Sequence, residues 1–156
     1  MTASIDNPST TATIFISSID NIKPTIAING DADEWKNKEI IGSKVNIPLM
    51  IVDRESGLDK TTFSIDDLTV KIGDTTITSN TSSGNNPYKT LKYKSETSGT
   101  YNYTLTLVNQ ALEGSITITV SEDKFFDMVQ NGNTTTTLNA GKIILGTPIT
   151  LISNKS

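Results

Sequence analysis

Short runs in which every second residue is apolar recur along the chain, and this pattern constrains its fold more than any other feature. A side-chain period of two is typical of a strand with one buried face, because successive strand residues point to opposite sides. The clearest runs cover 12–16, 26–28, 45–51, 68–72, 91–93, 101–107 and 116–120, and weaker ones cover 134–138 and 142–145. We therefore expect about eight or nine strands.

Turn signals separate these runs, and helical signals are few. Pairs such as Asn29-Gly30, Ser56-Gly57 and Ser98-Gly99 supply the positive φ angles that tight turns need. Only 32–40 and 122–129 are compatible with a helical turn or two. Short strands at spacings near ten residues predict an all-β antiparallel sandwich or barrel.

The same alternation predicts which side chains form the core. Pro48 interrupts the run at 45–51, and this indicates an edge position or a bulge, because proline cannot donate to a strand ladder. The expected core residues are Ile26, Ile47, Leu49, Ile51, Leu68, Val70, Tyr103, Leu105, Ile116, Ile118 and Val120.

Composition excludes several classes of function. The 156 residues suit one domain, and Thr, Ser and Asn make up 55 of them, as solvent-facing strand positions favour. A net charge of −4 and scattered basic residues argue against nucleic-acid binding. No apolar run approaches the length of a membrane span, so we expect no membrane insertion. The first residues also lack the basic and apolar regions of a signal peptide.

Cysteine and histidine are both absent from the sequence. Their absence removes disulfides, thiolate nucleophiles and histidine-based catalysis, together with most zinc and copper sites. Paired carboxylates remain available for glycoside hydrolysis, but such enzymes need a cleft, usually lined by aromatic residues, and the chain has one Trp, four Tyr and four Phe. We therefore expect a protein that is not an enzyme.

Four segments resemble, in the same order, those of bacterial immunoglobulin-like domains that occur in tandem. They are the Asp-Asn-x-x-Pro-Thr-Ile junction at 20–26, the strand and Ser-Gly turn within 52–74, the Gly-x-Tyr-x-Tyr segment at 99–103, and a closing turn with Asp127, Gly132 and Asn133. The gap between Asp127 and Gly132 is longer than in the family pattern. The resemblance covers roughly 20–140 and implies an immunoglobulin-like antiparallel β-sandwich of about seven to nine strands.

The resemblance also implies a domain organisation and a function. Residues 1–19 would be a linker or the last strand of a preceding repeat, 20–146 the domain, and 147–156 a tail or linker. Such domains serve as structural spacers or adhesive modules of extracellular, cell-surface or phage proteins. The expected partners are neighbouring domains, and also a host or cell-surface protein or glycan. The alternative is a carbohydrate- or protein-binding module that uses end loops around Trp35.

The acidic segment at 51–60 raises the question of a metal. Asp53, Glu55 and Asp59 resemble calcium-ligand spacing, because oxygen ligands at alternate loop positions can converge on one cation. The longer EF-hand pattern is missing. The favoured interpretation is that Asp53 ends a strand and caps the Ser-Gly turn while Asp59 lies in water. We thus expect no cofactor, with calcium at these residues as the alternative.

A second acidic group precedes the only tryptophan. Asp31, Asp33 and Glu34 could bind calcium at a domain junction, or they could cap the start of a helix and interact with its dipole. Capping is the favoured interpretation. Trp35 itself is more often a core residue than a sugar-stacking platform.

Overall fold

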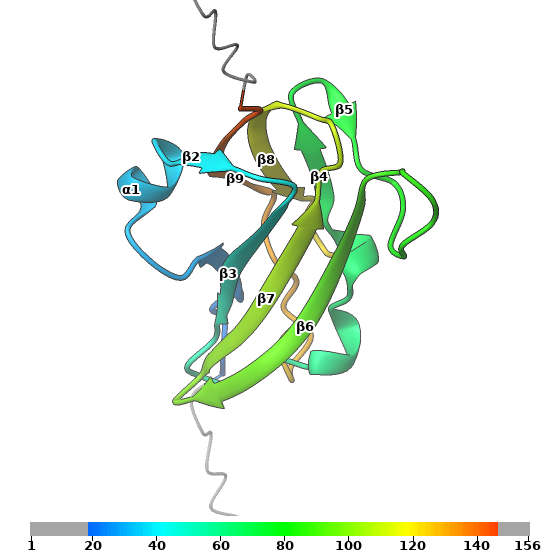
Figure 1. Cartoon of the computed structure of the whole chain (residues 1–156). Helices are drawn as coiled ribbons and strands as arrows, with labels where there is room; N and C mark the ends of the chain where they lie inside the picture. Colours follow the sequence, from blue (N-terminus) through cyan, green and yellow to red (C-terminus); the bar gives the residue numbers. More distant parts are fainter. Residues whose placement is uncertain (1–18, 147–156) are drawn as a thin grey trace, which may run out of the picture.

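Nine strands stack in two sheets, and this confirms the expected all-β sandwich (Figure 1). The computed structural model describes residues 19–146. The first sheet has the order β1 (Thr25–Ile28), β3 (Lys44–Val52), β7 (Thr100–Val108) and β6 (Tyr88–Thr97). The second has the order β2 (Glu39–Ile41), β9 (Thr136–Ile144), β8 (Gly114–Val120), β4 (Thr69–Ile72) and β5 (Thr75–Thr76). Three short helical segments connect them: α1 (Ala32–Lys36), η1 (Lys60–Thr62) and η2 (Ile65–Asp67).

Seven of the nine strands follow the order of a constant-type immunoglobulin sandwich. When β2 and β5 are left out and the other seven are lettered in chain order, β1, β3, β7 and β6 are A, B, E and D, and β9, β8 and β4 are G, F and C. The pairings between these nine strands are antiparallel except that of β2 with β9, which is parallel. The expectation of an entirely antiparallel sandwich missed this pairing, because the three residues of β2 are too few to show a period.

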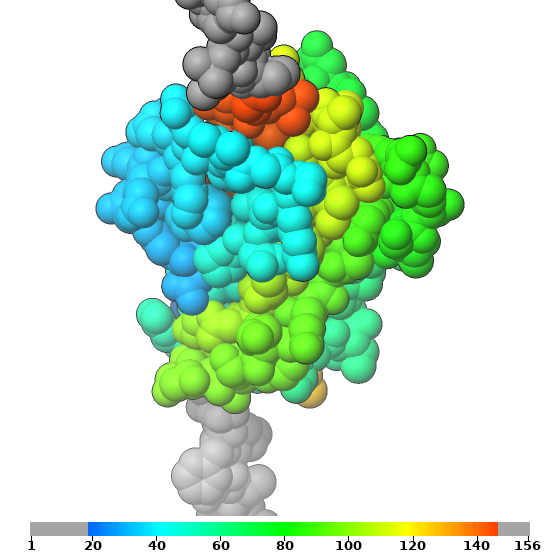
Figure 2. Space-filling model, viewed as in Figure 1, coloured from blue at the N-terminus to red at the C-terminus, as the bar shows by residue number. Residues whose placement is uncertain are grey.

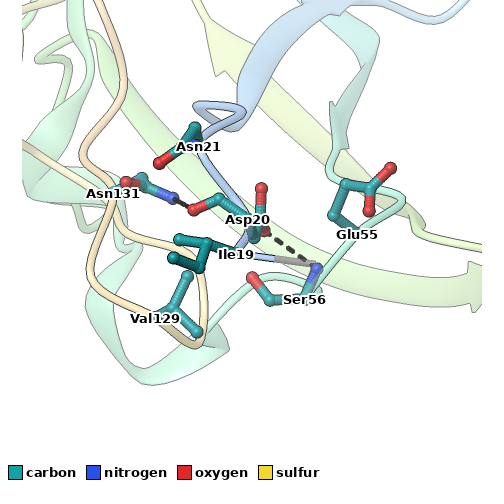
Figure 3. A pocket seen from close by; sticks show the side chains of 7 residues that line it. All are labelled: Ile19, Asp20, Asn21, Glu55, Ser56, Val129 and Asn131. Carbon is teal, nitrogen blue, oxygen red and sulfur yellow. Dashed lines mark hydrogen bonds between the residues drawn. The ribbon is translucent and has the colours of Figure 1, made fainter. Parts of the chain in front are cut away.

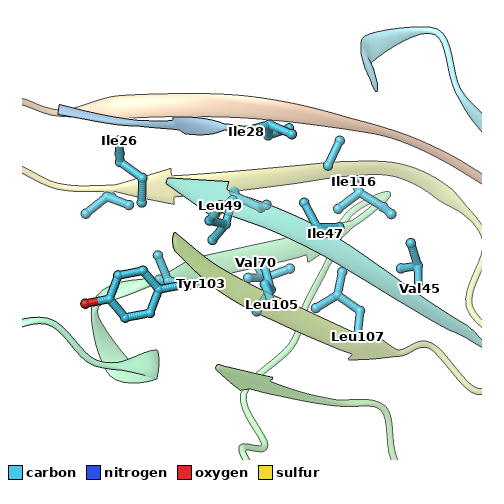
Figure 4. Packing of buried hydrophobic residues seen from close by; sticks show 14 of the residues in the cluster. Ile26, Ile28, Val45, Ile47, Leu49, Val70, Tyr103, Leu105, Leu107 and Ile116 are labelled. Carbon is cyan, nitrogen blue, oxygen red and sulfur yellow. The ribbon is translucent and has the colours of Figure 1, made fainter. Parts of the chain in front are cut away.

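The core lies between the sheets, and every residue predicted for it is buried. Figure 4 shows Ile47 and Leu49 of β3 beside Leu105 and Leu107 of β7, with Val70 and Ile116 contributed by the other sheet. The sequence did not predict Phe125, which is fully buried. Its ring packs edge-on against Phe63 with centroids 5.3 Å apart, and Phe63 packs in the same manner on Tyr103 at 5.0 Å.

The prediction of an edge or bulge at Pro48 was wrong. Strand β3 lies between β1 and β7, and its register with β7 continues without a shift past Pro48. Strand β1 ends at Ile28, opposite Leu49, and the Pro48 carbonyl accepts the N–H of Asn29 at 2.8 Å. An N–H at position 48 would point toward β1, which has already ended there. The proline therefore removes no hydrogen bond between the paired residues of β1 and β3.

Three further expectations need correction. The helical turn expected within 122–129 is absent, and this segment is an irregular connection held by buried side chains. The helix expected over 32–40 ends at Lys36, and Ile40 belongs to β2. The two weak runs near the end form one continuous strand, β9. The run at 12–16 and the segments 1–18 and 147–156 lie outside the described residues.

The described chain enters and leaves the sandwich at opposite ends (Figure 1). Thr25 of β1 pairs with Val52 at the end of β3, whereas Ile144 of β9 pairs with Ile41, just before β3 begins at Lys44. The nine residues of β3 run from the exit end of the sandwich to the entry end, a distance of about 26 Å. No helix among residues 19–146 has the length and apolar character needed to cross a membrane.

Candidate metal centre

Three aspartates from distant parts of the chain meet at the end where the described chain enters the sandwich. Asp20 precedes β1, Asp53 directly follows β3, and Asp127 lies in the connection between β8 and β9. One carboxylate oxygen from each lies within 4.8 Å of the other two. Asp53 is 2% exposed and Asp127 is fully buried, while Asp20 is partly exposed. Carboxylates are seldom buried without a partner, so this arrangement needs a physical explanation.

Local turns explain why two of the aspartates point inward. Asp53 Oδ1 accepts the N–H groups of Glu55 at 3.1 Å and Gly57 at 2.9 Å. Asp127 Oδ1 likewise accepts those of Val129 at 2.9 Å and Asn131 at 2.8 Å. Such side-chain bonds to the following backbone are typical of aspartate in turns, and they fix both carboxylates against their own loops.

Asp20 connects the incoming segment to both loops (Figure 3). Its Oδ2 accepts the N–H of Ser56 at 3.0 Å, and its backbone oxygen accepts Nδ2 of Asn131 at 3.0 Å. The Ser56 side chain beside it, and then the Ile22 N–H bound to Oδ1 at 2.8 Å, hold the pKa of Asp20 below its usual value. Asp20 is therefore ionised at neutral pH.

One oxygen of the cluster has no partner among residues 19–146. Asp53 Oδ2 is buried and accepts no hydrogen bond from these residues. The Ser56 hydroxyl is also buried, and although it lies close enough to favour the ionised form of Asp20, no hydrogen bond of normal geometry involves it. An unsatisfied buried carboxylate oxygen is costly, so this oxygen is the feature of the cluster that most needs a physical explanation.

The structure groups Asp53 with residues other than those its spacing suggested. Glu55 is exposed on the rim of an open depression of about 520 Å³ beside Asp20. Asp59 does not join the cluster, because its side chain caps η1 by accepting the N–H of Thr61 at 3.1 Å. Asp53 does cap the Ser-Gly turn as expected. Asp20 and Asp127 lie in two of the four segments that carry the family resemblance, but sequence spacing cannot show that they meet.

The second acidic group caps a helix, as expected. Asp31 is the N-cap of α1, and its Oδ1 accepts the N–H groups of Asp33 at 2.9 Å and Glu34 at 3.0 Å. Trp35 is partly buried against the core, and Lys38 Nζ lies 4.3 Å from its ring centroid. The ring therefore packs against the core on one side and carries a lysine on another.

A buried lysine forms another polar group that the sequence did not predict. Lys89 on β6 is 5% exposed, and its Nζ donates to the Ile65 carbonyl at 3.2 Å and to Asn80 Oδ1 at 3.1 Å. Asn80 Nδ2 in turn donates to Asp66 Oδ1 at 2.6 Å. Burial lowers the pKa of Lys89, and the Asp66 charge opposes that shift. These contacts anchor the segment that leads from β5 to β6.

On the face shown in Figure 2, no deep hollow opens between the blue-to-cyan and the yellow-green-to-green residues. Comparison of the chain with protein-family models, curated proteins and solved structures found no match.

Proposed function

We propose that this chain is a non-catalytic structural module, a spacer or adhesive immunoglobulin-like domain of a larger extracellular bacterial or phage protein. The observation that carries the proposal is the placement of the two ends of the described chain at opposite ends of the sandwich (Figure 1). Modules with that geometry can be joined end to end, and each one extends the chain by its own length.

The entry to the module supports this role. Pro24 is buried directly before β1, and its ring fixes the backbone where the chain joins the sandwich. Asp20 adds bonds to the loops after β3 and β8. An entry segment held in this way restricts the angle to whatever precedes it, as a rod of domains requires.

Solution scattering tests the proposal on a longer natural stretch of the polypeptide that includes the flanking segments. We expect an elongated particle whose maximum dimension grows in proportion to the number of modules. A compact particle, with modules folded back on one another, would contradict the spacer role.

The alternative of a glycan-binding module around Trp35 gains no support from the ring's surroundings. Stacking on a sugar requires a free aromatic face, whereas Trp35 contacts the core and carries Lys38. We expect the full chain to bind no sugar on a glycan array. Binding that Trp35→Ala abolishes would favour the alternative.

A further inference from the structure

We propose that Asp20, Asp53 and Asp127 bind one calcium ion at the entry end of the sandwich. The inference goes beyond the proposed function, because a cation at this place would hold the three segments together whatever the module does. It rests on the geometry of the cluster, on one unpaired buried oxygen and on the donor atoms that the chain offers.

The separation of the oxygens fits a shared ion. Calcium binds protein oxygens at about 2.3–2.6 Å, so two ligands on opposite sides of one ion lie about 5 Å apart. The three candidate oxygens lie within 4.8 Å of one another. They come from three loops and not from one continuous binding segment, so the spacing of any single loop does not show the site.

The second observation is the free oxygen of Asp53. Its Oδ1 is held by two backbone N–H groups, and this orients the carboxylate and leaves Oδ2 buried without a donor. Asp20 Oδ2 and Asp127 Oδ2 each accept one hydrogen bond, from Ser56 N–H and Asn131 Nδ2, and each keeps a further lone pair for a cation. The loops thus hold all three carboxylates in position before an ion arrives.

The charges point to the same ligand. Three carboxylates at this distance repel one another, and repulsion between like charges is strong where water is excluded. The hydrogen-bond donors to these carboxylates among the described residues are backbone N–H groups and the Asn131 amide, and none of these carries a positive charge. A divalent cation would supply the positive charge that these donors do not.

The donor set selects the kind of cation. Every ligand is a carboxylate oxygen, and the whole chain contains no histidine or cysteine, so the site suits a hard ion. Calcium accepts six to eight oxygens in flexible geometry, whereas magnesium demands a near-ideal octahedron. Three loops with their own hydrogen bonds fit the more permissive ion. Water in the open depression beside Asp20 can supply further ligands.

The test is thermal unfolding of the full chain in millimolar calcium and in a calcium chelator. With calcium well above its dissociation constant, we expect the unfolding temperature to rise by about 5–10 °C, because the ion binds only the folded state. The same concentration of magnesium should give a clearly smaller rise.

Asp53→Asn is the informative variant because its amide oxygen can still accept the two backbone N–H groups. We expect it to lose the calcium response and, in chelator, to unfold at the same or a higher temperature than the unmodified chain. A merely structural Asp53 would instead be destabilised by the change in both conditions. Asp59→Asn is the matched control, and its calcium response should be intact.

Four outcomes would overturn the proposal. They are no shift of the unmodified chain in calcium, an equal shift in magnesium, a full calcium response of Asp53→Asn, or a loss of response in Asp59→Asn. Should Asp53→Asn fail to fold, Asp20→Asn replaces it, because Asp20 is partly exposed and lies outside the core. Calorimetric titration should then show one calcium per chain for the unmodified protein and none for Asp20→Asn.

Discussion

Replacing Asn133 by alanine should remove a large part of the stability of this domain. Asn133 is 1% exposed and lies in the irregular connection between β8 and β9. Its Oδ1 accepts the N–H groups of Lys124 at 2.8 Å and Phe125 at 3.0 Å. Its Nδ2 donates to the carbonyls of Ser121 at 2.7 Å and Thr134 at 3.0 Å. One side chain thus supplies four bonds to a segment without regular structure.

The size of the effect follows from those four bonds. A typical intramolecular hydrogen bond contributes about 1 kcal/mol net, so losing all four lowers the free energy of unfolding by about 4 kcal/mol. Domains of this size are stable by about 5–15 kcal/mol, and the loss corresponds to a fall in Tm of about 12–20 °C. Phe125 follows the bonded Lys124 and is fully buried, so the loss also reaches the core.

Urea unfolding followed by circular dichroism measures this difference. Asn139→Ala is the matched control, because Asn139 is exposed on β9, and its loss should change stability by less than about 0.5 kcal/mol. Asn133→Asp keeps the acceptor but places an oxygen against two carbonyls, so it should destabilise as well. A loss below about 1 kcal/mol in Asn133→Ala would refute the view that this side chain holds the connection.

Three other predictions follow from single sites. Gly99→Ala should lower the free energy of unfolding in denaturant by about 2 kcal/mol or more, because φ is +78° and a Cβ would collide with the backbone of Asp53. Gly84→Ala is the control: φ is +57° but the space is free, so it should lower that free energy by only about 1 kcal/mol. Equal losses in the two variants would show that the collision at Gly99 has no effect. Burial raises the pKa of Tyr103 to about 12, so its share of the phenolate absorbance should appear only as the pH approaches 12, and the stability due to its neutral form should fall as pH rises from about 10 through 12. A phenolate absorbance that is already complete near pH 10 would be inconsistent with the burial of Tyr103. Lys89 should remain hydrogen-bonded and not cross-linked, so the intact mass should equal the calculated one, and a mass lower by one ammonia would reveal a covalent bond to its amide neighbour.

The strands could be predicted from sequence because their signal is local. In 101–107 the alternation alone indicates which face is buried, and Tyr103, Leu105 and Leu107 are buried as expected. Strand β2 has three residues and pairs with β9 about a hundred positions away, so nothing local marks it. Phe125 reaches the core from an irregular segment in which neither a helical nor a strand period applies.

The candidate site was only partly predictable, for a related reason. Spacing within 51–60 singled out Asp53, but spacing cannot show that Glu55 lies at a rim and that Asp59 turns back to cap η1. The partners of Asp53 come from residues 33 positions before it and 74 positions after it in the chain. Only the folding of the sandwich brings Asp20 and Asp127 to the end of β3.

The most direct test of the central claim, that a cation joins the entry segment to the sandwich, is a crystal structure of the full chain grown in calcium. We expect one ion with oxygens of Asp20, Asp53 and Asp127 at about 2.4 Å, including the Asp53 Oδ2 that has no partner among the described residues. A site filled only by water, or calcium bound elsewhere while the three carboxylates keep their present arrangement, would contradict the claim.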